Sequence, residues 1–381
     1  MILRVDVNPE RLRWARDRAG LDAERLTQRF PKYPEWESGT TKPTLKQLEA
    51  VAKATHAPIG MFFVSAPWDE PVPIPDFRVM GNRPISRPSV DLLDTVYLCQ
   101  QRQEWYRDFA RLERVDPPAL VRIATTGSDV ETTARTMREM LQFDVDQRSR
   151  LSTWEDALRL FITQADHCGV LVMVNGIVGN NTSRRLDPAE FRGFALADDL
   201  APLVFVNGAD TKAAQMFTLA HELAHICLGE SALSDIEAAI RPSHSIERWC
   251  DRVAAELLVP REKLADQFRS DVDLSTEVNR LARHFKVSTL VVLRRVFDLG
   301  GLDREAFEAA YQDELDHLTT VSQGGGNFHP TLRMRVGRRF GKALVDSTLA
   351  GRTSFTESFR LLGIKKSSTL RNFAASFDAG P

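Results

Sequence analysis

The sequence predicts a mostly helical α+β protein with a small three-stranded sheet near the middle of the chain. Two observations support this fold class. Apolar residues recur at helical spacing over most of the chain, and three short β-rich runs follow one another between residues 169 and 207, separated by turn residues. At 381 residues the chain is too long for one typical core, so we expect two or three domains.

Composition excludes several classes of protein. The hydrophobic fraction of 43% and the charged fraction of 27% are those of ordinary globular proteins, so neither a disordered nor a collagen-like chain is expected. Charged residues stand where a signal peptide would need an apolar segment, and no run approaches about 18 apolar residues. We therefore expect a cytoplasmic protein that binds no membrane. The four cysteines form no CxxC pair, which argues against disulfides and cysteine zinc clusters.

Residues 1–66 predict a small helical domain. Two amphipathic segments are followed by WESGTTKPT and by a further helical run. This order resembles the five-helix DNA-binding domains of the XRE/Cro repressor type over residues 8–64. The interval from Leu26 to Trp36 is about four residues shorter than that pattern and contains Pro31 and Pro34. Because proline removes an amide donor and clashes with the preceding turn, we expect no full recognition helix, and any DNA binding would depend on phosphate contacts.

Residues 67–150 are expected to form a strap and a helical connector. The run DEPVPIPDFR, residues 69–78, holds three prolines and should be extended. Residues 89–113 then have the periodicity of a long amphipathic helix, for which Ser89 is a suitable N-cap. Two shorter helices are expected at residues 129–141 and 153–167.

Residues 151–323 are predicted to form the central domain. Its three strands are expected in the runs GVLVMV (169–174), RGFALA (192–197) and PLVFVN (202–207). Residues 275–302 have a second helix-turn-helix-like pattern. We interpret it as two packed helices that complete the core, although a DNA-binding role is the alternative.

The C-terminal region, residues 327–381, is predicted to be a basic helical tail that follows a glycine hinge at residues 324–326. It holds ten Lys or Arg residues against three Asp or Glu, in a chain whose net charge is -2. Helical runs are expected near residues 331–349 and 354–376. The tail could bind nucleic acid or an acidic partner, or it could be an ordinary solvated helical surface.

The stretch FTLAHELAHICLG, residues 217–229, predicts a metal site on a buried helix. His221 and His225 are four residues apart, so both imidazoles lie on one face of a helix and can reach one cation. Glu222 completes an HExxH arrangement, in which the histidines bind zinc and the glutamate takes a proton from water. The surrounding residues are apolar nearly all round, so three unpaired polar groups would be costly there. Gly229 follows as a natural C-cap.

A third ligand is expected on a second helix, SIERWCDRVAAELLVP, because a catalytic zinc needs three protein ligands. Glu247 is our candidate, and Asp251, one turn later, is expected to accept a hydrogen bond from the far nitrogen of a ligand histidine. A solvent-facing charge pair is the alternative for these two residues. Cys250 is a softer candidate ligand and Glu256 a weaker one, whereas Cys227 is expected in the core.

The series RGFAL, PLVFVN, FTLAHELAH, IERWCDRVAAELLVP and LARHFKVS resembles the ImmA/IrrE metallopeptidases over residues 150–300. The resemblance implies a zinc-dependent endopeptidase that cleaves an XRE-type transcriptional repressor in response to stress, in bacteria or their mobile elements. It also implies that His221, His225 and Glu247 bind zinc and that Glu222 is the catalytic base.

Zinc proteases commonly bind a peptide as an added strand at a sheet edge. We expect this edge to be the RGFALA run, formed by Arg192, Gly193, Phe194, Ala195 and Leu196. A donor that stabilises the oxyanion is also expected. The candidates, among which the sequence does not choose, are His244, His284, Tyr311 and His329.

Two other functions are compatible with the sequence. The chain could be a transcriptional regulator or antitoxin-like module in which zinc is structural or sensory. It could also be a scaffold whose basic tail binds nucleic acid and thereby activates the peptidase. Glu222 favours the enzyme, because a purely structural site has no use for a carboxylate beside the metal.

Overall fold

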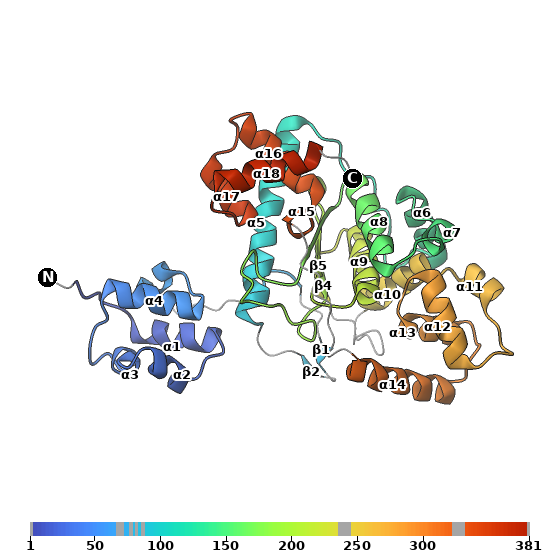
Figure 1. The fold of residues 1–381 in the computed structure, drawn as a ribbon, viewed down its shortest axis with the longest axis horizontal. Helices are drawn as coiled ribbons and strands as arrows, with labels where there is room; N and C mark the ends of the chain where they lie inside the picture. Colours follow the sequence, from blue (N-terminus) through green and yellow to red (C-terminus); the bar gives the residue numbers. More distant parts are fainter. Residues whose placement is uncertain are drawn as a thin grey trace. The chain divides into compact units, whose positions relative to one another are not determined.

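The computed structural model describes residues 3–65, 72–75, 79–80, 83–84, 88–234, 245–321 and 332–378. The chain divides into two compact units (Figure 1). The first comprises Met1–Pro73 and Ser86–Asp94, and the second comprises Ile74–Ile85 and Thr95–Pro381. The predicted subdivision of the second unit at residues 150 and 327 stays a prediction.

Five short helices make up the described part of the first unit before residue 66. They are α1 (Pro9–Arg18), α2 (Ala23–Arg29), α3 (Tyr33–Glu37), α4 (Leu45–Thr55) and the 3-10 helix η1 (Ile59–Phe63). Hydrogen bonds between near neighbours in the chain fix where these helices begin. Asn8 caps the amide of Glu10, and Thr44 forms a capping box with Gln47 at the start of α4. Leu12, Trp36, Leu48 and Phe62 are among the residues buried in a shared core.

Helix α3 has only five residues, in agreement with the prediction that no long helix forms between Leu26 and Trp36. Pro34 lies in its first turn, where a missing amide is tolerated. Tyr33 and Trp36 point into the core, with 0% and 3% of their surface exposed. The exposed side of α3 therefore presents Glu35, a charge that repels phosphate.

The remaining elements follow in chain order. They are β1 (Val79–Met80), β2 (Arg83–Pro84), α5 (Val90–Glu113), α6 (Val130–Met140), α7 (Val145–Ser149), α8 (Trp154–His167), β3 (Leu171–Asn175), β4 (Gly193–Leu196), β5 (Leu203–Asn207), α9 (Lys212–Leu228), β6 (Ala232–Ser234), α10 (Ser245–Leu258), α11 (Arg261–Gln267), α12 (Leu274–Phe285), α13 (Thr289–Asp298), α14 (Arg304–Val321), α15 (Leu332–Val336), α16 (Arg338–Leu349), α17 (Phe355–Leu362) and α18 (Ser367–Asp378). Ser89 accepts a hydrogen bond from the Leu92 amide and so caps α5, as predicted.

The central sheet has the order β3-β5-β4-β6, in which β3 and β5 are parallel and the other pairs are antiparallel. The three predicted strands are confirmed, but the three-strand count is wrong because Ala232–Ser234 adds a fourth. This strand is too short to show a periodic pattern in the sequence. The prediction that RGFALA is an edge strand is also wrong, because β4 pairs with β5 on one side and with β6 on the other.

Helices cover both faces of this sheet, with α8 and α9 on one side and α5 on the other, and α15 packs against the edge strand β3 (Figure 1). Val172 and Val204 belong to the core that also contains the apolar residues of α8 and α9. On the opposite face, Gln103 of α5 donates hydrogen bonds to the carbonyls of Leu196 and Ala201, at 2.8 and 2.9 Å. Because both faces are covered, strands β3, β4 and β5 are buried throughout.

The two helices predicted from residues 275–302 are α12 and α13, and they complete the core as predicted. Val278, Phe285 and Val292 are buried in the same cluster as the residues of α9.

The C-terminal helices are built into the second unit. The buried guanidinium of Arg102 donates to the carbonyls of Leu361 and Arg335, at 3.0 and 3.4 Å. Arg339 donates to the Tyr106 hydroxyl at 2.7 Å, and its amide donates to Asp166 at 3.0 Å. Part of the basic charge of this region is therefore used inside the fold. No helix in the described ranges is both long and apolar enough to cross a membrane.

Candidate metal centre

Helix α9 carries the HELAH segment through the middle of the second unit. Thr211 caps its first turn by accepting a hydrogen bond from the Ala214 amide. Gly229 ends it with φ of 73°, the left-handed conformation that glycine adopts without strain, which confirms the predicted C-cap. Every residue from Gln215 to Cys227 is buried, as the nearly uniform apolar character of this helix predicts.

Three candidate ligand atoms meet at one point between α9 and α10. The Nε2 atoms of His221 and His225 are 3.1 Å apart. The two carboxylate oxygens of Glu247 lie 3.2 Å from His221 Nε2 and 3.1 Å from His225 Nε2. Among the described residues, these three form the one group whose ligand atoms are close enough to share a metal ion.

The spacing and chemistry of these donors fit a zinc ion. A tetrahedral zinc with bonds of about 2.0–2.1 Å keeps neighbouring ligand atoms about 3.3 Å apart, close to the 3.1–3.2 Å found here. Two histidines and a glutamate are also a known ligand set of catalytic zinc, which leaves a fourth position for water or substrate. The donors are 0–3% exposed, so an ion bound there would be shielded from bulk solvent.

Asp251 contacts the imidazole nitrogen of His221 that faces away from the centre, as predicted. Its Oδ1 atom lies 2.9 Å from His221 Nδ1, so Nε2 is left to face the centre. Burial lowers the pKa of His221, but Glu247 and Asp251 outweigh burial and hold it well above the usual value. Burial raises the pKa of Glu247, but the two histidines outweigh it and lower this pKa strongly. Glu247 is thereby kept in the ionised form that binds metal.

Glu222 follows the candidate ligand His221 in the chain and is completely buried. Strand β4 approaches this part of α9 very closely because residue 193 is glycine. A Cβ atom at Gly193 would lie 2.5 Å from Thr218 Cγ2 and 3.1 Å from Glu222 Oε1. This close approach of β4 to Glu222 was not among the sequence predictions, although a glycine inside a strand often marks a close approach by another element.

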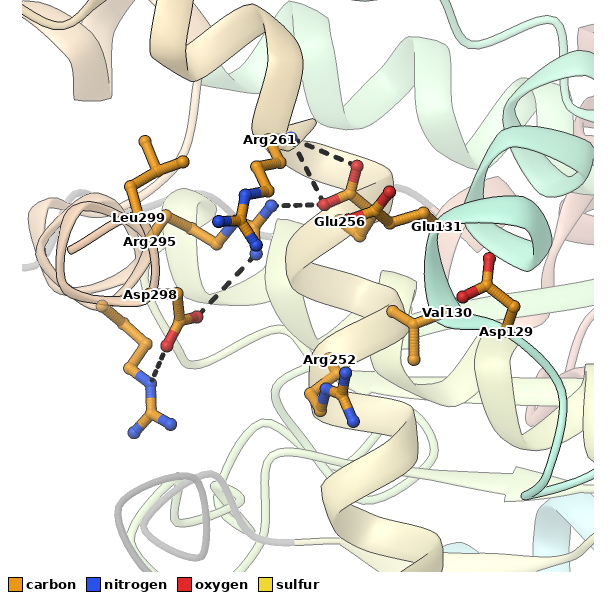
Figure 2. A pocket seen from close by; sticks show the side chains of 10 residues that line it. Asp129, Val130, Glu131, Arg252, Glu256, Arg261, Arg295, Asp298 and Leu299 are labelled. Atoms are coloured by element: carbon orange, nitrogen blue, oxygen red, sulfur yellow. Dashed lines mark hydrogen bonds and ion pairs between the residues drawn. The ribbon is translucent and has the colours of Figure 1, made fainter.

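The other candidate ligands lie elsewhere. Cys250 is buried, but it is not in the group of ligand atoms that lie close enough to share an ion. Glu256 is on the opposite side of α10, in a pocket where it pairs with Arg295 and accepts a hydrogen bond from the Arg261 amide (Figure 2). Cys227 is in the core, as predicted.

The predicted substrate-strand and oxyanion residues are not found at the centre in the described part of the chain. Arg192 lies 3.6 Å from Asp210 in an ion pair, and the four residues after it are buried in β4, so this run has no open edge for substrate. Among the oxyanion candidates, His244 and His329 lie outside the described residues. His284 is surrounded by charges of Arg280, Arg148 and Asp146, none of which belongs to the centre. Tyr311 packs on Phe307 of its own helix.

Comparison with known families agrees with this geometry. Residues 165–297 match the family model Peptidase_M78, described as an IrrE N-terminal-like domain. This match contains the three candidate ligands, Glu222 and Asp251, and suggests a metallopeptidase of the IrrE and ImmA kind. Residues 336–376 match a second model, a domain of unknown function (DUF8813). Curated protein sequences gave no match.

Proposed function

We propose that this chain is a zinc-dependent endopeptidase. The observation that carries the proposal is the convergence of His221, His225 and Glu247 on one point, together with the buried carboxylate of Glu222, which follows His221 in the chain. A regulator with a structural metal would need the first three groups but not the fourth. The peptidase family match over the same residues supports the enzyme.

In this proposal some residues bind the metal and another transfers a proton. His221, His225 and Glu247 would hold zinc, and Asp251 would keep His221 in the correct orientation and tautomer. Bound zinc would supply Lewis acidity, which makes water more acidic and polarises a peptide carbonyl. Glu222 accepts a proton from the attacking water as the new C–O bond forms. It then donates a proton to the leaving amine as the C–N bond breaks.

We assign the substrate edge to β6 instead of β4. An extended peptide can add to a sheet only beside a strand that has no other strand on its outer side, and among the described residues β6 is the outermost strand on this side. In the register of the sheet, Ser234 of β6 pairs with Gly193, the residue that abuts Glu222. A peptide along the outer edge of β6 would therefore run two strand spacings, about 10 Å, from Gly193.

We further propose that the substrate is an XRE-type transcriptional repressor, in a stress-response, mobile-element or phage-defence setting. The support is the N-terminal five-helix unit, whose sequence resembles such repressors. This unit would recognise the substrate, or the DNA to which it is bound, and bring it to the peptidase.

Metal content and a conservative substitution test the proposal together. The purified chain should contain about one zinc, and His221→Ala or Glu247→Ala should greatly reduce it. Glu222→Gln should keep zinc and fold but lose at least about a hundredfold in repressor cleavage, the usual scale of a general base. Glu230→Gln, at an exposed position just beyond α9, is the matched control and should keep full activity.

Two results would contradict this assignment. Equal cleavage by wild type and Glu222→Gln at the same zinc content would remove Glu222 from the mechanism. If wild type cleaved no candidate repressor, with or without DNA, a regulator with a structural or sensory zinc would become the better interpretation.

A further inference from the structure

The structure assigns a second role to the proline-rich strap: we propose that Ile74 and Pro75 occupy the outer edge of β6 and block it against substrate. The inhibitory consequence rests on the proposed peptidase function. That the chain's own segment occupies this edge does not depend on the peptidase function, and it can be tested separately.

The backbone of β6 shows which of its groups face outward. Phe194 of β4 is paired with Leu233 of β6 in the antiparallel register. The amide of Leu233 donates not to β4 but to the carbonyl of Pro75, at 2.9 Å. Because amides of an edge strand point alternately toward and away from its neighbour, Leu233 is the residue of Ala232–Ser234 whose backbone groups an incoming peptide would use. The Leu233 amide that such a peptide would use already donates its hydrogen bond to the Pro75 carbonyl.

The described part of the strap bends at Pro73 and Ile74, and burial changes from residue to residue along it. Ile74 is buried, whereas Pro73 and Pro75 on either side of it are exposed. Ile74, which belongs to the second unit, is thus the one buried residue in the described part of the strap, residues 72–75.

Proline makes this segment a weak competitor. Pro73 and Pro75 have no amide, so the strap can accept a hydrogen bond from the edge at these residues but cannot donate one. A substrate without proline at these positions would form the fuller ladder. The strap can therefore cover the edge when no substrate is bound, and a peptide that forms more hydrogen bonds can displace it.

The chain connectivity adds to the effect. Ile74–Ile85 belongs to the second unit, whereas the residues that flank it, up to Pro73 and from Ser86, belong to the first. The segment is thus tethered at both ends. A short tether gives an effective concentration on the order of millimolar, which is enough to maintain a contact of low intrinsic affinity.

The test uses the full-length chain, loaded with zinc. Substitutions at Ile74 weaken the contact between the strap and the second unit. Ile74→Asp places a charge at the buried position, and Ile74→Ala is a milder version that preserves the fold more safely. Ile59→Asp makes the same chemical change at a residue that is 37% exposed and is the matched control. Thermal unfolding shows that each variant remains folded.

Binding is measured with a fluorescein-labelled peptide of residues 70–78, in a Glu222→Gln background that cannot cleave it. We expect the peptide to bind the Ile74→Asp chain at least about tenfold more tightly than the chain with an intact strap, because the cis competitor is removed. Ile74→Ala should give a smaller change in the same direction. Cleavage of fluorescein-labelled casein by chains with native Glu222 should rise by a similar factor in Ile74→Asp and stay unchanged in Ile59→Asp.

The two measurements separate the two proposals. Equal peptide binding with and without Ile74→Asp, or equal gains from Ile59→Asp, would overturn the blocking role and make the strap a structural cover of the sheet edge. Tighter peptide binding in Ile74→Asp, with no cleavage by any chain, would support occupation of the edge while refuting the peptidase assignment.

Discussion

Gly193→Ala is expected to damage the metal centre without touching any ligand. The new Cβ atom would lie 2.5 Å from Thr218 Cγ2 and 2.9 Å from the Phe205 carbonyl oxygen. Carbon atoms in contact are normally about 3.5–4.0 Å apart, so the overlap with Thr218 is about 1 Å. Neither neighbour is the end of a long flexible side chain, so α9 must move away from β4.

The size of the effect follows from this displacement. Overpacking of a core by one methyl group typically costs about 1–3 kcal/mol of unfolding free energy. The movement falls on the turn of α9 that holds Glu222, whose Oε1 would be only 3.1 Å from the new atom. A shift of about 1 Å in a catalytic group can lower the rate about a hundredfold. Activity should therefore fall much further than stability.

Thermal unfolding, zinc analysis and repressor cleavage measure the three parts of this prediction. Gly60→Ala is the matched control, because a Cβ atom there meets nothing within 4 Å, and it should leave cleavage unchanged. Adding Thr218→Ser to Gly193→Ala removes the closest clash and should restore part of the lost stability. The reasoning fails if Gly193→Ala unfolds at the wild-type temperature and cleaves at the wild-type rate.

Three further predictions concern other parts of the chain. A fragment of residues 1–66 should bind duplex DNA weakly, with little sequence preference and a steep loss in salt; a nanomolar, sequence-selective complex at physiological salt would contradict this. Arg102→Ala should lower the unfolding free energy by about 1–3 kcal/mol, because buried carbonyls of the C-terminal helices lose their donor. Arg111→Ala, on the exposed surface of the same helix, should change it by less than about 0.5 kcal/mol in the same denaturant titration. Burial raises the pKa of Cys99 to about 12, so near pH 8 iodoacetamide should modify this thiol roughly a thousandfold more slowly in the native chain than in urea, as mass spectrometry can measure.

The sequence alone determined the helix that carries the site. Residues four apart on a helix share one face, so the spacing of His221 and His225 is sufficient to predict a metal-binding pair. The start and end of local elements were equally accessible, because capping involves only near neighbours in the chain: Ser89 begins α5 and Gly229 ends α9.

Contacts between distant segments were decided by the tertiary structure. Glu247 became a candidate ligand from its residue type and spacing, but its 3.1–3.2 Å distances to the histidines depend on how α10 packs against α9. The RGFALA run showed that a strand exists, but a strand's own pattern does not say which strands lie beside it. Its outer neighbour, Ala232–Ser234, has three residues and no readable period. For the same reason, the prolines predicted an extended strap, but the chain bends at Pro73 and Ile74. Its place at the edge of β6 follows from one hydrogen bond between residues far apart in the chain.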